Sequence, residues 1–396
     1  MAIIKPPKYV RQVLFTLQSR GWPAYLVGGC VRDMLLGVRP HDWDICTGAL
    51  PEQILEIFPG SLTVGLKHGT VTVRMDSHLV EVTTFRAEGD YSDHRHPDLV
   101  RFVGDLTADL SRRDFTMNAI ALSADGLLAD PFGGAEDIRN KLIRCVGDPA
   151  ARFEEDALRM FRALRFSARL GFAIDLFSLE GIRQKAALAA YLAPERIREE
   201  LEKLLLTDAP ETMFELMELG LLDHLLQKRE GDAALFDRLR RLPKRKIERW
   251  AGFCLILLRS GCILSVQEFL SALRMDNRSI RLCALCAELL ASPLPEDSRG
   301  VKRLLKKNAA EGVLCAALVQ DALYGGRSAR LVKQVLKSGE CYCLEELAIS
   351  GRDLLALGMR GPDVGVMLDF LLEYVIEYPA NNRRELLLAL AAGSEE

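Results

Sequence analysis

The sequence of 396 residues lacks the features that mark membrane or secreted proteins. No apolar run approaches the roughly 20 residues that span a bilayer. The first residues, MAIIKPPKYV, do not have the layout of a signal peptide. We therefore expect a cytoplasmic protein with no membrane contact. We find no internal repeat, and the length suits about two to four domains.

The chain also lacks the paired cysteine motifs of a zinc finger, although it contains ten cysteines. Cys283 and Cys286 form a C-x-x-C, but no second pair follows at the required spacing. The pair lies in an apolar helical pattern, which favours thiols buried in the core. A metal site remains the alternative interpretation at this stage.

The sequence has little net charge, −3, which argues against a general nucleic-acid binder. Positive charge is nevertheless concentrated in the C-terminal half. It gathers in segments 238–249 and 301–307 and at Arg327, Arg330, Lys333 and Lys337. Each cluster alone could be a solvated helix face. Together they favour a surface that binds phosphates.

Two kinds of hydrophobic periodicity divide the chain. Up to about residue 135, short β-rich segments alternate with helical patterns. The expected strands cover 24–27, 42–46, 71–75, 79–85 and 120–123, and the expected helices 9–20, 30–36 and 52–57. From residue 135 onward the pattern is helical almost throughout. The sequence therefore predicts an α+β protein, with a small head that has a mixed sheet (1–135) and helical regions over 136–205, 206–300 and 301–396.

Candidate catalytic residues lie in two neighbouring stretches, YLVGGCVRDMLLG and HDWDICTG. Gly28 and Gly29 end a strand before a helix that carries Arg32, so backbone N–H groups and a guanidinium can approach a phosphate. Asp42 and Asp44 are two residues apart, so both carboxylates share one face of an extended strand and Trp43 points into the core. The alternative is that these residues only form a turn and a cap.

The two carboxylates repel each other unless a cation lies beside them. We expect Mg²⁺ at Asp42 and Asp44, because this ion prefers oxygen ligands and commonly bridges substrate phosphates. Glu81 lies in LVEVTTFR, a β-branched segment that can pair alongside. Three carboxylates on adjacent strands would suit metal-assisted phosphoryl transfer.

Further motifs follow in order: RRDFTMNA, DPFGG, EEDALRMFRALRF and APERIREEL. Over residues 25–205 the chain thereby resembles the bacterial class II tRNA nucleotidyltransferases, the CCA-adding enzymes. The resemblance implies a polymerase-β-like nucleotidyltransferase head followed by a helical neck, body and tail. It implies template-independent addition of CCA to tRNA from CTP and ATP, with the helical regions holding the acceptor arm. A poly(A) polymerase, or an enzyme that adds only A or CC, is the alternative.

The resemblance also implies roles for individual residues. Asp42 and Asp44 match the aspartates that hold the metal, and Glu81 matches a third catalytic carboxylate. The positions that match nucleotide-binding residues are Gly29, Arg32, Arg113, Asp156, Arg159, Arg162 and Arg165. Segment 87–105 matches a loop needed to pass from C to A addition, and its full length favours complete CCA synthesis. The oligomeric state stays open, a homodimer included.

The run FEEDALRMFRALRF, residues 153–166, fits one amphipathic helix with an apolar stripe that includes Phe161 and Leu164. Its charges could be plain surface ion pairs, each worth about 0.2–0.5 kcal/mol. Base chemistry suggests another interpretation, since cytosine and adenine both present an amino donor beside a ring acceptor. Asp156 beside Arg159 would accept these bases and reject guanine and uracil by about 1–3 kcal/mol.

Overall fold

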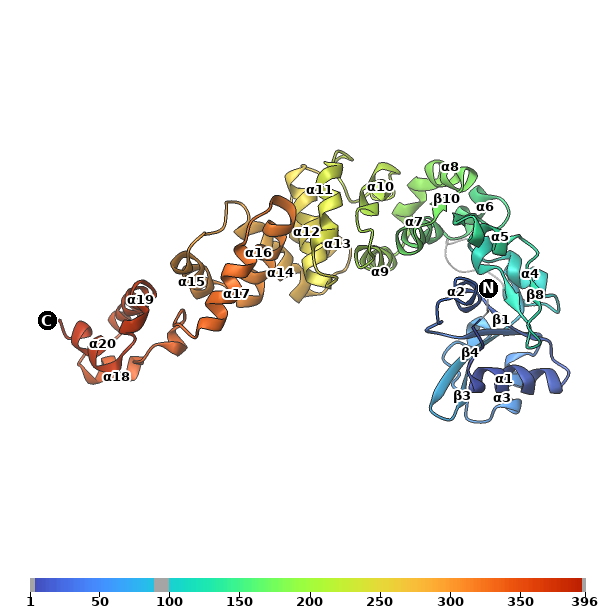
Figure 1. Ribbon diagram of the computed structural model, residues 1–396, viewed down its shortest axis with the longest axis horizontal. Helices are drawn as coiled ribbons and strands as arrows, with labels where there is room; N and C mark the ends of the chain where they lie inside the picture. The colour runs from blue at the N-terminus through green and yellow to red at the C-terminus, as the bar shows by residue number, and fades with distance from the viewer. Residues whose placement is uncertain (1–3, 89–99, 394–396) are drawn as a thin grey trace. The chain divides into compact units, whose positions relative to one another are not determined.

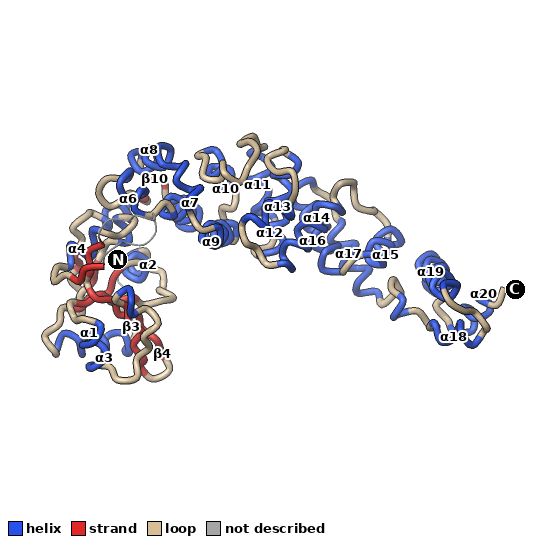
Figure 2. Tube along the Cα trace, turned by 180° about the vertical axis from the view of Figure 1, so that it is seen from behind, coloured by secondary structure: helices blue, strands red, loops and turns tan. Residues whose placement is uncertain are grey.

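The structure, a computed structural model, describes residues 4–88 and 100–393. The chain divides into two compact units, Met1–Leu204 with Glu215–His224 (unit 1) and Leu205–Phe214 with Leu225–Glu396 (unit 2). All strands of the described ranges belong to unit 1, whereas unit 2 is helical there (Figures 1 and 2). The α+β prediction is therefore confirmed. The finer division into four domains stays a prediction, and most of the 87–105 loop lies outside the described residues.

A six-stranded mixed sheet forms the centre of the head, in the order β3-β4-β2-β1-β7-β8. Strands β2 and β4 pair in parallel, and the other neighbours pair antiparallel. The bounds are β1 (Ala24–Val27), β2 (Asp44–Thr47), β3 (Thr70–Met75), β4 (His78–Thr84), β7 (Ala121–Leu122) and β8 (Leu128–Ala129). A separate pair consists of β5 (Arg86–Glu88) and β6 (Val100–Phe102).

Buried and more exposed residues alternate along β3 and β4, and this alternation shows which side chains face the core. The buried residues are Val71, Val73, Val80 and Val82, and they pair with one another across the hairpin. Because successive side chains of a strand point to opposite faces, Thr72 and Glu81, which also pair, leave from the other face. Burial of the valines thus fixes the face on which the acid of β4 stands.

Short helices pack on the sheet of the head. Helix α1 (Lys8–Ser19) contacts β1, and helix α3 (Pro51–Ile57) contacts β3 and β4 (Figure 1). Helix α2 (Gly29–Leu35) starts directly after β1, and α4 (Leu106–Ser111) and α5 (Gly134–Arg139) complete the set. Helices α1, α2 and α3 match the expected helices to within a few residues at each end, whereas α4 and α5 were not expected.

The segment after the head contains one departure from helix. Strands β9 (Leu142–Ile143) and β10 (Ala173–Ile174) form a short parallel pair. The helices of this segment are α6 (Pro149–Glu155), α7 (Leu158–Leu170), α8 (Leu176–Lys185), α9 (Pro194–Leu205) and α10 (Thr212–Glu218). The described chain beyond residue 135 is thus helical almost throughout, as expected, and this short pair is an exception.

The prediction of a single helix over residues 153–166 is wrong, because the structure has α6 and α7 with a break between them. Asp156 has an extended backbone, with φ −145° and ψ 101°. Its carboxylate accepts a hydrogen bond at 3.1 Å from the backbone N–H of Leu158, the first residue of α7. Phe161 and Leu164 are fully buried, so the predicted apolar stripe of α7 is confirmed.

Unit 2 is built from ten α-helices in its described part. They are α11 (Ala233–Arg238), α12 (Lys246–Arg259), α13 (Val266–Ala272), α14 (Asn277–Leu289), α15 (Ser298–Lys307), α16 (Ala310–Tyr324), α17 (Ser328–Ser338), α18 (Gly351–Ala356), α19 (Pro362–Glu377) and α20 (Arg384–Ala391). Trp250 and Phe253 are fully buried on α12. Cys283 and Cys286 are also fully buried, on α14, as the core-thiol interpretation requires. No helix in the described ranges is long and apolar enough to cross a membrane.

A row of ion pairs joins α15 to α19 within unit 2. The pairs are Arg299–Glu377, Arg303–Glu373, Arg303–Glu377, Lys306–Asp369 and Lys306–Glu373. On the same helix, Lys302 is buried and pairs with Glu340. The basic cluster at 301–307 is therefore largely neutralised inside the protein, which the sequence alone did not indicate.

Candidate active site

The two aspartates of the D-x-D motif lie at the entry to β2. Asp44 is the first residue of β2, whereas Asp42 stands in a bend two residues earlier. The strand expected over 42–46 thus begins late, and Pro40, which lacks an N–H group for strand pairing, lies just before the bend. Both aspartates nevertheless line the same pocket. Trp43 between them is buried, as predicted.

Glu81 stands beside Asp44 on the neighbouring strand. Parallel pairing of β2 with β4 sets Asp44 opposite Glu81. Paired residues of adjacent strands project from the same face of a sheet. The prediction that the Glu81 strand pairs alongside the aspartates is therefore confirmed, while the catalytic role of Glu81 stays a prediction.

The negative charge at this edge of the sheet is not fully compensated. Burial raises the pKa of Asp44 to about 6, with further contributions from Glu81 and Asp42, and Arg113 opposes the shift. Among the described residues, no three His, Cys, Asp or Glu side chains form a ready metal cage. Mg²⁺ is usually held by one or two carboxylates together with substrate phosphates and water. The two aspartates therefore fit a divalent cation that completes its shell with nucleotide oxygens.

A pocket of about 340 Å³ adjoins the aspartates and collects most of the predicted site residues. Those that line it are Gly29, Arg32, Asp42, Asp44, Arg113, Arg162 and Arg165. The predicted residues outside its lining are Glu81, Asp156 and Arg159. Five arginines in all face this pocket, which suits a polyanionic ligand such as a triphosphate.

Gly28, rather than Gly29, is the glycine that the turn requires. Its φ of 78° and ψ of −136° are accessible to glycine and strained for other residues. A Cβ atom at Gly28 would lie 3.0 Å from Nη1 of Arg113 and 3.8 Å from Oδ2 of Asp44. The missing side chain therefore lets the guanidinium of Arg113 approach the acidic edge.

Arg113 lines the pocket and is held there by an acid. Its Nη2 atom donates to Asp109 at 3.2 Å. Its Nε atom is buried and has no hydrogen-bond partner among the described residues. Leaving a buried donor unpaired costs about 1–3 kcal/mol. Because a guanidinium has five N–H donors and Arg113 lines the pocket, it can also bind an anion such as a phosphate group, which supports its predicted nucleotide contact.

We expect Gly28→Ala to weaken binding of a nucleoside triphosphate about ten-fold, because the new methyl group displaces Arg113 and strains the turn. Equilibrium titration with CTP measures the change. Gly126→Ala is the matched control, since Gly126 also has a positive φ, 90°, but nothing lies within 4 Å of its added Cβ. Equal weakening in both variants would contradict the proposed crowding at Arg113.

The ring of Phe166 on α7 gathers three guanidinium groups. The guanidinium carbons of Arg165, Arg32 and Arg162 lie 4.1, 5.1 and 5.3 Å from its centroid. Such cation–π contacts hold arginines in defined positions. Arg32 is also buried and donates to Asn118 at 2.7 Å. Phe166 and Asn118 belong to the motifs EEDALRMFRALRF and RRDFTMNA, and sequence alone predicted no role for them. In the structure they hold the arginines of the pocket in position.

Asp114 fixes Arg162 at the wall of the pocket. Its Oδ2 atom accepts from Nε and Nη2 of Arg162 at 2.8 and 2.6 Å, and its Oδ1 atom accepts from Asn118 at 2.9 Å. Burial alone would raise the pKa of Asp114, but Arg162 and the hydrogen bond from Asn118 outweigh it and lower the pKa to about 2. Sequence reasoning noted Asp114 in RRD but assigned it no function.

Asp114→Asn is expected to destabilise the folded protein by about 2 kcal/mol at pH 7. The pKa of this carboxyl group falls from 3.8 to about 2 on folding, so its stabilisation is present above about pH 4 and disappears as the pH falls through about 2. Urea unfolding at pH 7, 4 and 2.5 measures the difference from the unmodified protein. A difference that is equal at all three pH values would contradict the ion-pair explanation.

Asp156 and Arg159 are held by different partners in this structure. The two oxygens of Asp156 accept from Nη1 and Nη2 of Arg196 at 3.2 and 2.9 Å. Arg159 is buried, pairs with Glu155 and donates to the carbonyl oxygen of Arg112 at 3.0 Å. The expected geometry of one helix face is therefore corrected, because Asp156 precedes α7. Their role in reading a base stays a prediction.

Comparison with known proteins places these features in context. A family model described as "Poly A polymerase head domain" matches residues 24–144. A second one, described as "Probable RNA and SrmB- binding site of polymerase A", matches residues 171–233. The first region contains the sheet and all three acids, and the second lies entirely within the helical part of the chain apart from β10.

Curated proteins and solved structures match nearly the whole chain. A CCA-adding enzyme of Geobacillus sp. (strain WCH70) is 39% identical, over 94% of this chain and 93% of the relative. A CCA-adding enzyme of Enterococcus faecalis (strain ATCC 700802 / V583) is 38% identical, over 97% and 95%. The crystal structure of the Bacillus stearothermophilus CCA-adding enzyme in complex with CTP is 34% identical, with a TM-score of 0.82 and 98% of both chains covered.

Proposed function

Because the chain belongs to the family of CCA-adding enzymes and is a nucleotidyltransferase, we propose that it completes the 3′ end of tRNA with CCA, using CTP and ATP without a nucleic-acid template. One observation carries the proposal. The carboxylates of Asp42 and Asp44 share a pocket with five arginines, so a triphosphate and a divalent cation can meet at one edge of the sheet.

In the proposed reaction, the 3′-hydroxyl oxygen of tRNA bonds to the α-phosphorus of the incoming nucleotide. The bond from that phosphorus to the oxygen bridging to the β-phosphate breaks, pyrophosphate leaves, and the hydroxyl group loses its proton. Arg113 lines the pocket and holds the triphosphate through its guanidinium group, and the backbone of Gly29 approaches it from the turn. Arg32, Arg162 and Arg165 line the same pocket and orient the nucleotide.

A divalent metal ion serves this family, and we propose that the ion is Mg²⁺ at Asp42 and Asp44. When bound, it lowers the pKa of the attacking hydroxyl and stabilises the negative charge that develops on the phosphates. The two aspartates supply hard oxygen ligands, which this ion prefers. Glu81, paired with Asp44, adds negative charge that favours a cation at this edge.

Nucleotide selection would rest on Asp156 and Arg159. The carboxylate accepts the amino group of cytosine or adenine, and the guanidinium donates to the ring nitrogen beside it. Arg196 binds both oxygens of Asp156 in this structure, so a base that binds the carboxylate competes with this ion pair. Guanine and uracil would instead set a carbonyl oxygen against the carboxylate.

Incubation of the purified protein with tRNA that lacks its CCA end tests the proposal. We expect two cytidines with CTP alone, CCA with CTP and ATP together, and then a stop, as read by sequencing the products. A long adenosine tract would identify a poly(A) polymerase instead. Addition of only A or only CC would identify a specialised enzyme. The two curated relatives described above are CCA-adding enzymes, which does not favour these alternatives.

The substrates CTP, ATP and unfinished tRNA belong to the cytoplasm, which supports that location for the enzyme. The helical regions would hold the acceptor arm through its backbone, because an RNA duplex is recognised mainly by shape and phosphate contacts.

A further inference from the structure

The cations of unit 2 fall into a paired set and a set that faces solvent. On α15, Arg299, Arg303 and Lys306 pair with acids of α19. In the first basic segment, the pairs are Arg240–Glu211, Lys244–Asp208, Arg245–Glu248 and Lys246–Asp276. Each internal pair reduces the positive charge that an approaching polyanion would meet. The sequence clusters therefore overstate the binding capacity of these two segments.

Helix α17 carries the contrasting set. Arg327 at its N-cap, and Arg330, Lys333 and Lys337 within it, are all exposed. None of the four has an ion-pair partner in the part of the chain that the structure describes. No aspartate or glutamate occurs within α17. The charged side chains of this helix are therefore all positive, and no acid of the helix neutralises them.

The helical repeat sets these cations on one face. At 100° per residue, the four positions fall within an arc of about 120°. Ala329, Val332 and Val335 are buried on the remaining side of the helix. A rise of 1.5 Å per residue separates Arg330 from Lys337 by about 10 Å along the axis. The row is thus long enough to meet more than one phosphate of a continuous backbone.

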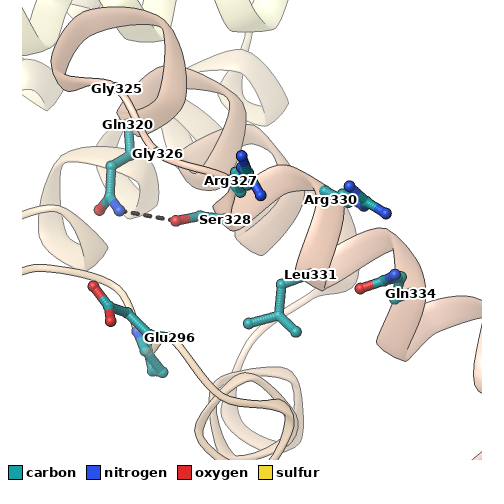
Figure 3. Close-up of a pocket in the computed structure, with 10 residues that line it drawn as sticks. Glu296, Gln320, Gly325, Gly326, Arg327, Ser328, Arg330, Leu331 and Gln334 are labelled. Carbon is teal, nitrogen blue, oxygen red and sulfur yellow. Dashed lines mark hydrogen bonds between the residues drawn. The ribbon is translucent and has the colours of Figure 1, made fainter.

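A pocket of about 580 Å³ lies at the start of this row. Figure 3 shows Arg330 and Gln334 side by side along α17, while Leu331 points toward the segment that carries Glu296. Gln320 donates to the hydroxyl of Ser328 at 2.9 Å and lines the same pocket. Arginine, amide and hydroxyl groups together suit the phosphates and sugar hydroxyls of RNA.

The N-terminal N–H groups of α17 are already satisfied. The carboxylate of Asp321 accepts from the backbone N–H groups of Ser328 and Ala329, both at 2.9 Å. A phosphate at the helix terminus would therefore have to displace an acid. A phosphate is attracted instead by the cationic side chains on the exposed face. A chain of phosphates would therefore lie along the helix rather than at its end.

We propose that the face of α17 formed by Arg327, Arg330, Lys333 and Lys337 binds the phosphate backbone of tRNA. This inference rests on the proposed function and specifies where unit 2 contacts the substrate. It assigns backbone contact to α17, whereas the cations of α15 hold α19. Binding of this kind is independent of sequence and weakens steeply as the salt concentration rises.

A triple variant, Arg330→Gln, Lys333→Gln and Lys337→Gln, tests the proposal by direct tRNA binding without nucleotides. We expect the dissociation constant for tRNA to rise about ten- to a hundred-fold at low salt. The slope of log affinity against log salt should become shallower by about three, roughly one for each lost contact. The KM for CTP should not change, because the substituted residues do not line the head pocket.

The matched control removes the same charge from α15, by Arg299→Gln, Arg303→Gln and Lys306→Gln. These cations are paired with acids of α19, so the salt slope should change less than in the α17 variant. Unchanged tRNA affinity in the α17 variant, or an equal change of slope in both variants, would overturn the proposal. If the α17 variant loses affinity while the unmodified protein adds no nucleotides, the surface stands and the proposed function fails.

Discussion

Asp44→Asn is expected to lower kcat for nucleotide addition by at least about a thousand-fold. The substitution removes a charged oxygen ligand from the proposed cation site, and a bound metal ion contributes several kcal/mol to stabilisation of the transition state. Rates of CTP incorporation into tRNA that lacks its CCA end, measured at saturating substrate, give the change. Affinity for tRNA should stay the same, because the lost interaction acts on the reacting phosphate.

Folding should survive this substitution. Asp44 is one of three acids that repel one another at the sheet edge, so its neutralisation should not lower the melting temperature of the metal-free protein. Asp76→Asn is the matched control, because Asp76 is an exposed turn residue with φ 53°, which asparagine tolerates equally well. A kcat within ten-fold of the unmodified enzyme in Asp44→Asn would remove this residue from the catalytic site.

Asp156→Asn is expected to reduce discrimination against UTP and GTP by about five- to 150-fold, the equivalent of 1–3 kcal/mol. Asparagine keeps the size of aspartate and one oxygen that can accept a hydrogen bond from the backbone N–H of Leu158. It replaces one acceptor oxygen with a donor amide, which can meet the carbonyl oxygen of uracil or guanine. The ratio of kcat/KM values for CTP and UTP, and for ATP and GTP, measures the effect.

The ion pair with Arg196 needs its own control, because Asp156→Asn also weakens that contact. Arg196→Gln removes the same ion pair and leaves the carboxylate in place. This control should retain full discrimination and bind CTP at least as tightly, since a competitor for Asp156 is gone. Equal loss of discrimination in the two variants would show that the ion pair, rather than the carboxylate, selects the base.

Local patterns in the sequence predicted five of the six strands of the head sheet, β8 being the exception, and they indicated that Glu81 lies on a strand. Alternating valines in β3 and β4 determine which face is buried, and that choice sets Glu81 beside Asp44. The prediction that Asp42 and Asp44 share one face of a strand assumed that both lie on the strand. Asp42 lies in a bend before it, and hydrophobic periodicity does not predict such loop geometry. Both aspartates nevertheless line the pocket, Asp44 from the start of β2 and Asp42 from the bend before it.

Long-range partners account for the other differences between prediction and structure. Asp156 lies 40 residues from Arg196, and no helical pattern predicts that contact or the break between α6 and α7. The cations of α15 look available in sequence but pair with acids some 70 residues further along, such as Glu373. Charge clusters predict binding surfaces only after such internal pairs have been subtracted.

A crystal structure with Mg²⁺ and a non-hydrolysable CTP analogue would test the central claim most directly. The account predicts a cation between Asp42, Asp44 and the triphosphate. It also predicts the cytosine amino group on the carboxylate of Asp156, with Arg159 donating to the ring nitrogen and Arg196 released. A cytosine bound by other side chains, with Asp156 still paired to Arg196, would contradict the claim that these two residues read the base.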